Sequence, residues 1–168
     1  EGLRAQELEA AIHVQGGASP FATELPPYSL LIELSADLPP AQLNLRELLH
    51  TALEAAFESG EVVDAALDKD EALWALRHAV SEGLREQGAV IGFDISLPRC
   101  KVWAFREQAS AFLAAHFAPA KVCDFGHLGD GGQHFNLVWP KSVPALSAED
   151  GLRLRDDSGT GAFNMRRA

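Results

Sequence analysis

The sequence predicts an α+β domain with a largely antiparallel sheet. Three patterns support this: short runs with an apolar residue at every second position, longer runs with apolar residues every three or four positions, and a glycine-rich turn between the last two strand-like runs. Of the 168 residues, 47% are hydrophobic, which is enough for one core at this length. We therefore expect one folded domain or a piece of a larger protein.

The first part of the chain predicts two strands and a helix after an opening segment. Residues 1–26 form a lead-in, an amphipathic piece followed by a loop that contains glycine and proline. Residues 28–34 alternate as a strand does, because every second position is Tyr, Leu or Ile. Residues 41–58 carry apolar residues at spacings of three and four, which predicts a helix with one buried face. Residues 61–67 are short and partly β-branched, which favours a strand.

The second part of the chain predicts two more helices and three strands, with Asp68 or Asp70 as the cap of the first helix. These elements are a helix over 70–86, a strand over 88–95, a helix over 101–116 and strands over 121–126 and 133–139. Strands mixed with helices and a closing hairpin indicate a ferredoxin-like arrangement, a largely antiparallel sheet with helices packed on one face. Residues from about 141 predict a loosely ordered tail, above all 156–161.

Composition excludes several classes of protein. Lys and Arg total 14 against 24 Asp and Glu, a formal charge of −10, and this acidity argues against nucleic-acid binding. No apolar run is long enough for a transmembrane segment. Cys100 and Cys123 suggest two buried thiols in a reducing compartment, which predicts a cytoplasmic location. Because the chain starts at Glu1 and its only methionine is Met165, we expect it to belong to a longer protein.

Two histidines near the glycine-rich turn are candidate metal ligands. If 133–139 is a strand, His134 and Asn136 share one of its faces, and the hairpin brings His127 back towards them. Two imidazoles on adjacent strands can share a zinc ion, although a zinc site needs further ligands. The alternative is a pair of solvated or hydrogen-bonded histidines beside a tight turn. A dinucleotide site is excluded, because these glycines precede a strand rather than a helix.

Helix 70–86 carries a candidate anion site. Arg77 and Ser81 lie one turn apart on one face, and a guanidinium beside a hydroxyl suits a carboxylate ligand. The alternative is an ion pair between Arg77 and either Glu71 or Glu82 on a solvated helix surface.

Four stretches, in order along residues 27–139, resemble the C-terminal domain of the FAD-linked oxidases. The stretch FGHLGDG followed by HFN, within 125–136, resembles that family's GHxGDGNxHxN signature. Residues 27–34 are similar to its strand ending in glutamate, 73–77 to its LWxLR helix and 93–98 to its YDxSLP segment. This family includes the D-lactate, D-2-hydroxyglutarate and glycolate dehydrogenases of the vanillyl-alcohol-oxidase-type flavoproteins.

The resemblance implies a function for each candidate residue. FAD would sit in a separate N-terminal FAD-binding domain, and this domain would cap it and form the pocket for a small 2-hydroxy acid, whose hydride passes to the flavin. His127 and His134 would bind a metal, commonly zinc, that holds the substrate's hydroxyl and carboxylate. Arg77 would hold the substrate carboxylate, with Ser81 and Asn136 nearby as hydrogen-bonding groups. No catalytic residue is assigned.

The chain departs from the family pattern at several positions. Gly132 stands where the family has Asn, Gly92 where it has Lys, and His78 where it has Glu. The family's later SAEHGIG segment, which supplies a third metal ligand and a histidine base, is not found, and 147–151 resembles it without the histidine. A non-catalytic regulatory or interaction module on the same scaffold is therefore the alternative function.

The predicted organisation follows from these boundaries. We expect the lead-in over 1–26, the FAD-linked oxidase domain over 27–140 and the tail over 141–168. The isolated fragment should be inactive without its flavin. The sequence leaves open whether the domain forms a homodimer and whether the parent protein associates with a membrane.

Overall fold

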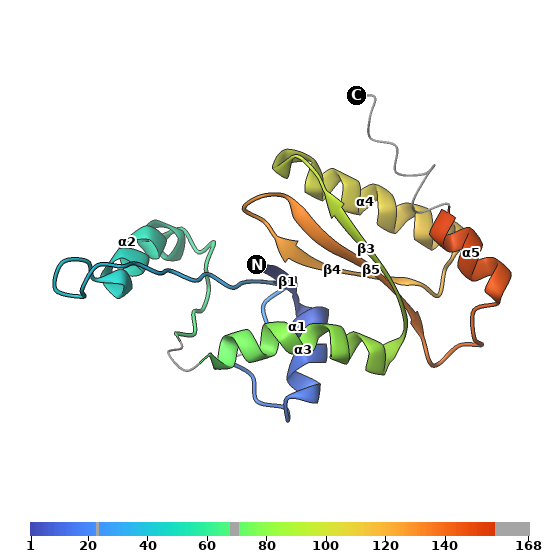
Figure 1. Cartoon of the computed structure of the whole chain (residues 1–168), viewed down its shortest axis with the longest axis horizontal. Helices are drawn as coiled ribbons and strands as arrows, with labels where there is room; N and C mark the ends of the chain where they lie inside the picture. Colours follow the sequence, from blue (N-terminus) through green and yellow to red (C-terminus); the bar gives the residue numbers. More distant parts are fainter. Residues whose placement is uncertain (23, 68–70, 157–168) are drawn as a thin grey trace.

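The computed structural model describes residues 1–22, 24–67 and 71–156, and an antiparallel sheet of five strands runs through this part of the chain (Figure 1). The strand order is β2-β1-β4-β5-β3, and every pairing is antiparallel. The α+β class and the antiparallel sheet are therefore confirmed. The strands are β1 (Gly2–Arg4), β2 (Tyr28–Leu30), β3 (Gly88–Ser96), β4 (Lys121–His127) and β5 (Gly132–Pro140).

Helices cover both faces of this sheet, which corrects the prediction of helices on one face. On one face, α1 (Ala5–Val14) and α3 (Ala72–Gln87) pack on a core that includes Phe125 and Val138. On the other face, α4 (Arg99–His116) and α5 (Ala148–Asp156) pack on a second core that includes Phe135 and Leu137. The reason lies in β5, where neighbouring residues that point to opposite faces are both apolar and both need cover.

Helix α2 (Leu45–Glu58) forms as predicted but its apolar face is not buried. The Asn44 side chain caps it by accepting a hydrogen bond from the Glu47 backbone N–H at 3.3 Å. None of its residues is buried, and Figure 1 shows it standing apart from the sheet. Leu48 is 49% exposed and Phe57 42% exposed. Periodicity predicted the helix, but the sheet faces are already covered by α1, α3, α4 and α5.

Three further predictions need correction, and a fourth cannot be assessed. Residues 61–67 form no strand, and the strand predicted over 28–34 ends at Leu30. The tail predicted to be loose contains α5, whose Leu154 is fully buried in the second core. The predicted caps Asp68 and Asp70 lie outside the described residues, as does 157–161 of the tail.

The lead-in residues contribute to the body of the domain. Strand β1 pairs with β2 over its whole length and with β4 at Gly2. Helix α1 packs along α3, where Gly83 lies against Ala10. The first residues of the chain therefore lie inside the sheet, between β2 and β4, and β4 carries His127 of the histidine motif.

The two cysteines differ in environment. Cys123 is buried in the first core, and burial raises the pKa of its thiol to about 12. Cys100 is exposed at the start of α4, so the prediction of two buried thiols is wrong for this residue. Both are free thiols.

We expect a thiol reagent to modify Cys100 rapidly in the native protein and Cys123 only after unfolding, because only a thiolate that the reagent can reach reacts. Titration with Ellman's reagent should count one thiol per chain in buffer and two in concentrated urea. Equal rates for both thiols in buffer would contradict the burial of Cys123.

A network of ion pairs connects β1, α1, β4 and α4. Arg4 lies 3.3 Å from Glu7 and 3.5 Å from Asp124, and Arg106 from α4 bonds Asp124 at 2.7 Å. Glu7 is fully buried, and its carboxylate also accepts a hydrogen bond from the Arg4 backbone N–H at the start of α1. Burial raises the pKa of Glu7 above 4.5, although Arg4 and Gln6 favour the charged form.

The raised pKa of Glu7 predicts how pH affects stability. Since the folded state holds this proton more tightly than the unfolded state, the stability that the carboxyl contributes is fully present below pH 4.5 and is lost as pH rises through the folded pKa. We therefore expect the stability deficit of Glu7→Gln, measured by urea unfolding against wild type, to shrink as pH rises above 4.5. Glu9→Gln, at an exposed position of the same helix, is the control. A deficit that grows with pH would contradict the assignment.

Candidate functional site

The hairpin between β4 and β5 places the two motif histidines on one face of the sheet. Its turn is tight: the backbone N–H of Gly131 donates to the His127 carbonyl at 3.0 Å, and Gly131 has a φ of 82°. A Cβ at Gly131 would lie 1.9 Å from the Leu97 carbonyl oxygen, so only glycine fits here. Phe125 pairs with His134 across the strands, and the rings of His127 and His134 are 6.3 Å apart.

Helix α3 brings Arg77 onto this hairpin. The buried residues Val80 and Leu84 fix the helix on the first core. The Arg77 guanidinium carbon then lies 4.7 Å from the centre of the Phe125 ring, a cation–π contact. The predicted anion-binding residue and the predicted metal ligands are therefore neighbours in space.

The partner of Arg77 is Glu1, not Glu71 or Glu82. Arg77 Nε donates to Glu1 Oε2 at 2.8 Å and Arg77 Nη2 donates to Glu1 Oε1 at 3.2 Å, a bidentate pair. The side chains are only 14% and 5% exposed. This bond uses the Nε–Nη2 edge of the guanidinium, so the Nη1 end is the part of Arg77 that remains for another anion.

Glu1 also connects Arg77 to the hairpin. Its backbone exchanges hydrogen bonds with Leu31 at 2.9 and 2.8 Å, which extends the β1–β2 pairing by one residue. Its Oε1 lies 3.2 Å from His127 Nε2. Burial alone would raise the pKa of the Glu1 carboxyl, but the hydrogen bond and charge of Arg77, with a smaller effect of His127, lower that pKa below 4.5.

A second carboxylate faces the other histidine. Asp94 of β3 pairs with His134 in the ladder, and the distance from Asp94 Oδ1 to His134 Nδ1 is 2.7 Å. The Asp94 side chain is 86% exposed and the His134 side chain 40% exposed. Glu1 and Asp94 are thus the two site residues that the sequence did not predict; the register of β3 against β5 is the signal that identifies Asp94.

The residues in contact around Arg77 are called the Arg77 cluster below: Glu1, Arg77, Asp94, Phe125, His127 and His134. The remaining predicted residues lie at its edge. Ser81 is half-buried one turn after Arg77 on α3. Asn136 is half-buried on β5, where its Nδ2 donates to the His134 carbonyl at 3.1 Å. Gly92 is its ladder partner, and a Cβ at Gly92 would lie 3.1 Å from Asn136 Oδ1.

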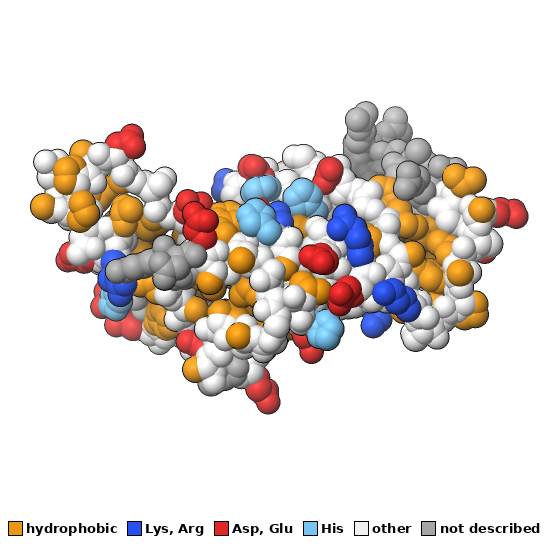
Figure 2. Space-filling view, turned by 60° about the horizontal axis from the view of Figure 1, so that its bottom comes forward, with side chains coloured by type: hydrophobic (Ala, Val, Ile, Leu, Met, Phe, Trp, Pro, Cys, Tyr) orange, Lys and Arg blue, Asp and Glu red, His pale blue; other side chains and the backbone are white. Residues whose placement is uncertain are grey.

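The donor set fits a metal ion only in part. His127 and His134 lie side by side, yet among residues 1–22, 24–67 and 71–156 no group of three His, Cys, Asp or Glu side chains is placed to hold one. The role of the two histidines as metal ligands therefore stays a prediction. Figure 2 shows histidine side chains close together on one face of the molecule, with acidic and basic side chains around them.

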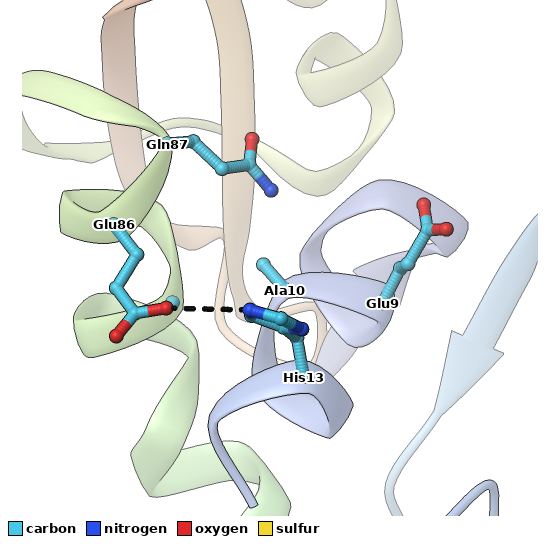
Figure 3. Close-up of a pocket in the computed structure, with 6 residues that line it drawn as sticks. Glu9, Ala10, His13, Glu86 and Gln87 are labelled. Atoms are coloured by element: carbon cyan, nitrogen blue, oxygen red, sulfur yellow. Dashed lines mark ion pairs between the residues drawn. The ribbon is translucent and has the colours of Figure 1, made fainter. Parts of the chain in front are cut away.

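Two hollows of the surface lie away from these histidines. One of about 300 Å³ opens between α1 and α3 and is lined by Glu9, His13 and Glu86 among others, with His13 Nε2 3.6 Å from Glu86 Oε2 (Figure 3). A second of about 450 Å³ lies between the end of α4 and the loop before α5. Neither is lined by a residue of the Arg77 cluster.

Across the described residues, no helix is long and apolar enough to span a membrane.

Comparisons with known proteins identify the class of domain that carries this cluster. Residues 4–150 match the model of the family "FAD linked oxidases, C-terminal domain", so the chain belongs to that family.

Its relatives are named for one activity. The chain is 35% identical over 118 residues to the mitochondrial D-2-hydroxyglutarate dehydrogenase of Bos taurus, covering 67% of this chain and 20% of that protein. It is 32% identical over 129 residues to the D-2-hydroxyglutarate dehydrogenase of Stutzerimonas stutzeri, covering 74% of this chain and 26% of that protein. The mitochondrial enzyme of Arabidopsis thaliana is 30% identical over 129 residues, with 74% and 22% covered. The chain thus spans about a fifth to a quarter of these relatives.

Proposed function

We propose that this domain forms the substrate pocket of an FAD-dependent dehydrogenase that oxidises a D-2-hydroxy acid. The observation that carries the proposal is the position of Arg77. Its guanidinium bonds the carboxylate of Glu1 and lies over the Phe125 ring, and the same carboxylate lies 3.2 Å from Nε2 of His127, which is part of the family motif. The flavin would be held by an N-terminal FAD-binding domain of the same protein.

The substrate class follows from the chemistry of this cluster. The Nη1 end of Arg77 suits a carboxylate, and the nearby polar groups of Ser81 and Asn136 suit the 2-hydroxyl. The relatives act, by name, on D-2-hydroxyglutarate, and lactate and glycolate carry the same carboxylate and hydroxyl. A D-2-hydroxy acid of this group is therefore the proposed substrate.

The reaction removes two hydrogens from the substrate. A bound FAD would supply the acceptor for the hydride of C2, and the hydroxyl proton would pass to water or a base, so that a 2-oxo acid would form. Arg77 holds the carboxylate, and Phe125 keeps the guanidinium in place and excludes water from one of its sides. Glu1 fixes the direction of the guanidinium, since it occupies the other edge.

We also propose that His127 and His134 bind a zinc ion, with substrate oxygens as further ligands. The side-by-side imidazoles support this, and a bound zinc ion would lower the pKa of the substrate hydroxyl. Against it stands the lack of a third protein ligand among the described residues. Elemental analysis after zinc loading should find one zinc per chain, lost in His127→Ala and in His134→Ala. No zinc in the wild type would remove the metal from the proposal and leave the Arg77 site in place.

Location and assembly remain proposals. The Bos taurus and Arabidopsis thaliana relatives are named as mitochondrial, whereas the Stutzerimonas stutzeri relative is not, so the predicted cytoplasmic location applies best to a bacterial source. Limited proteolysis tests the predicted domain boundaries of 27–140. Measurement of the mass in solution tests whether the domain forms a homodimer.

The activity is tested on the complete product of the gene. It should purify with bound flavin, and the flavin should be reduced by D-2-hydroxyglutarate, D-lactate or glycolate. L-2-hydroxyglutarate and L-lactate are matched controls, and they should reduce the flavin much more slowly. A product without flavin, or one that no D-2-hydroxy acid reduces, would overturn the enzyme proposal and favour the non-catalytic module.

A further inference from the structure

Residues 31–67, which we call the arm, present a concentrated apolar surface. The arm consists of α2 and the segments on either side of it, and none of its residues is buried. It contributes seven of the twelve exposed large hydrophobic side chains of the described chain, each at least 40% exposed: Ile32, Leu34, Leu38, Leu48, Phe57, Val63 and Leu67. Figure 2 shows hydrophobic side chains gathered on the lobe that the arm forms at the left of the molecule. Such a surface is typical of a site that another protein surface covers.

The charge of the arm indicates which partner fits it. The arm carries seven Asp and Glu residues against one basic residue, Arg46. A second copy of this chain, with a net charge of −10, would bring like charges together, above all if two arms met in a symmetric dimer. A domain that binds FAD has a positive potential where it holds the diphosphate. Charge therefore favours a partner of that kind over a second copy.

Both ends of the arm join the domain at the Arg77 cluster. At its start, the backbone of Leu31 exchanges hydrogen bonds with Glu1, whose carboxylate bonds Arg77. At its end, the chain continues towards α3, which begins at Ala72 and carries Arg77. Figure 1 shows the amino terminus between α2 and the strands of the sheet. A domain that covers the arm therefore lies beside this cluster, where a flavin must come within about 3–3.5 Å of a substrate to react with it.

We propose that the arm is the docking surface for the FAD-binding domain of the same protein, which meets it with an apolar surface edged by lysine and arginine side chains. The inference rests on the proposed function for the identity of this partner. Because the two domains belong to one chain, their effective concentration is on the order of millimolar, so an interface of modest area is sufficient. Docking covers Leu48 and Phe57 and holds the flavin next to the Arg77 cluster.

Photo-crosslinking in the complete product of the gene tests what covers the arm. The crosslinking residue p-benzoylphenylalanine replaces Phe57 on α2, and in the matched control it replaces Leu152, which is 65% exposed on α5 at the other face of the sheet. We expect irradiation to join position 57, but not position 152, to peptides of the FAD-binding domain of the same molecule. A crosslink from position 57 only to a second copy, no crosslink, or equal crosslinking from both positions would overturn the proposal.

Hydrogen exchange of the α2 amides gives a second readout. A helix without a buried residue exchanges quickly unless another surface covers it. In the complete product, we expect the amides of 45–58 to exchange at least about 10-fold more slowly in the wild type than in Leu48→Asp. Leu152→Asp is the matched control and should keep the wild-type exchange of this helix. Equal exchange over 45–58 in the wild type and in Leu48→Asp would contradict a covered arm.

The readouts separate the docking surface from the proposed function. A complete product that binds flavin and oxidises a D-2-hydroxy acid, but whose arm is neither crosslinked nor protected, would overturn the docking surface alone. A complete product whose arm is crosslinked to the FAD-binding domain, but which oxidises no D-2-hydroxy acid, would support the docking surface and overturn the proposed function.

Discussion

Replacement of Arg77 by methionine is expected to lower the free energy of unfolding by about 3 kcal/mol, because it removes the guanidinium that bonds both oxygens of the buried Glu1 carboxylate and leaves that carboxylate only the contact with His127 Nε2 at 3.2 Å. Glu1 is 5% exposed, and both of its oxygens bond Arg77. Methionine keeps much of the length of the arginine side chain and its contact with Phe125, so the loss reports mainly on the missing charge. Urea unfolding at neutral pH measures it.

The double variant Arg77→Met with Glu1→Gln separates the charge from the packing. It should recover much of the loss, since neither side chain is then a buried unpaired charge. Arg77→Met alone should also abolish binding of D-2-hydroxy acids by the complete protein, and the double variant should not restore that binding. A double variant as unstable as Arg77→Met would show that the loss comes from packing and would contradict the ion pair as the cause.

Replacement of Gly83 by alanine is expected to cost about 2 kcal/mol or more, despite the higher helix propensity of alanine. A Cβ at Gly83 would lie 2.3 Å from the carbonyl oxygen of Ala10 and 2.5 Å from its carbonyl carbon. These are backbone atoms of α1, so the helices themselves must move apart. Because α3 carries Arg77, we also expect weaker binding of D-2-hydroxy acids.

Gly151→Ala is the matched control within another helix. A Cβ at Gly151 meets only a methyl carbon of Leu146 at 3.6 Å, which is an ordinary contact. Here the same substitution should raise the free energy of unfolding by about 0.5–1 kcal/mol. Urea unfolding of the two variants should thus show changes of opposite sign. A stabilising effect of Gly83→Ala would contradict the close contact between α1 and α3.

The apolar patterns of the chain predicted where helices and strands form, but they predicted less well which of these elements are buried. Helix α3 was predicted over 70–86 and spans Ala72–Gln87, and the hairpin strands agree within two residues at each end. Helix α2 was predicted equally well, but not its exposure. A periodic apolar face shows that a segment forms an amphipathic helix; whether the face is covered depends on where the chain path places it.

The sequence pointed to three of the residues that the structure brings together, but not to the carboxylates that contact them; the roles of these residues stay predictions. Arg77, His127 and His134 stood out because their spacing and neighbours resemble a family signature, and the structure gathers them around Phe125. Glu1 and Asp94 did not stand out, because an isolated glutamate or aspartate in a sequence resembles many solvated ones. Their contacts join residues that are 76 and 40 positions apart in the chain.

By itself, the sequence determined what depends on neighbours along the chain: the α+β class, the helix and strand periods, the tight hairpin and the family motifs. The tertiary structure decided which charges meet and which sheet faces are covered. Glu1 reaches Arg77 because β1 lies beside β4, and Asp94 reaches His134 because of the β3–β5 register. Ion pairs act over a few ångströms in space, and separation along the chain does not reveal that distance.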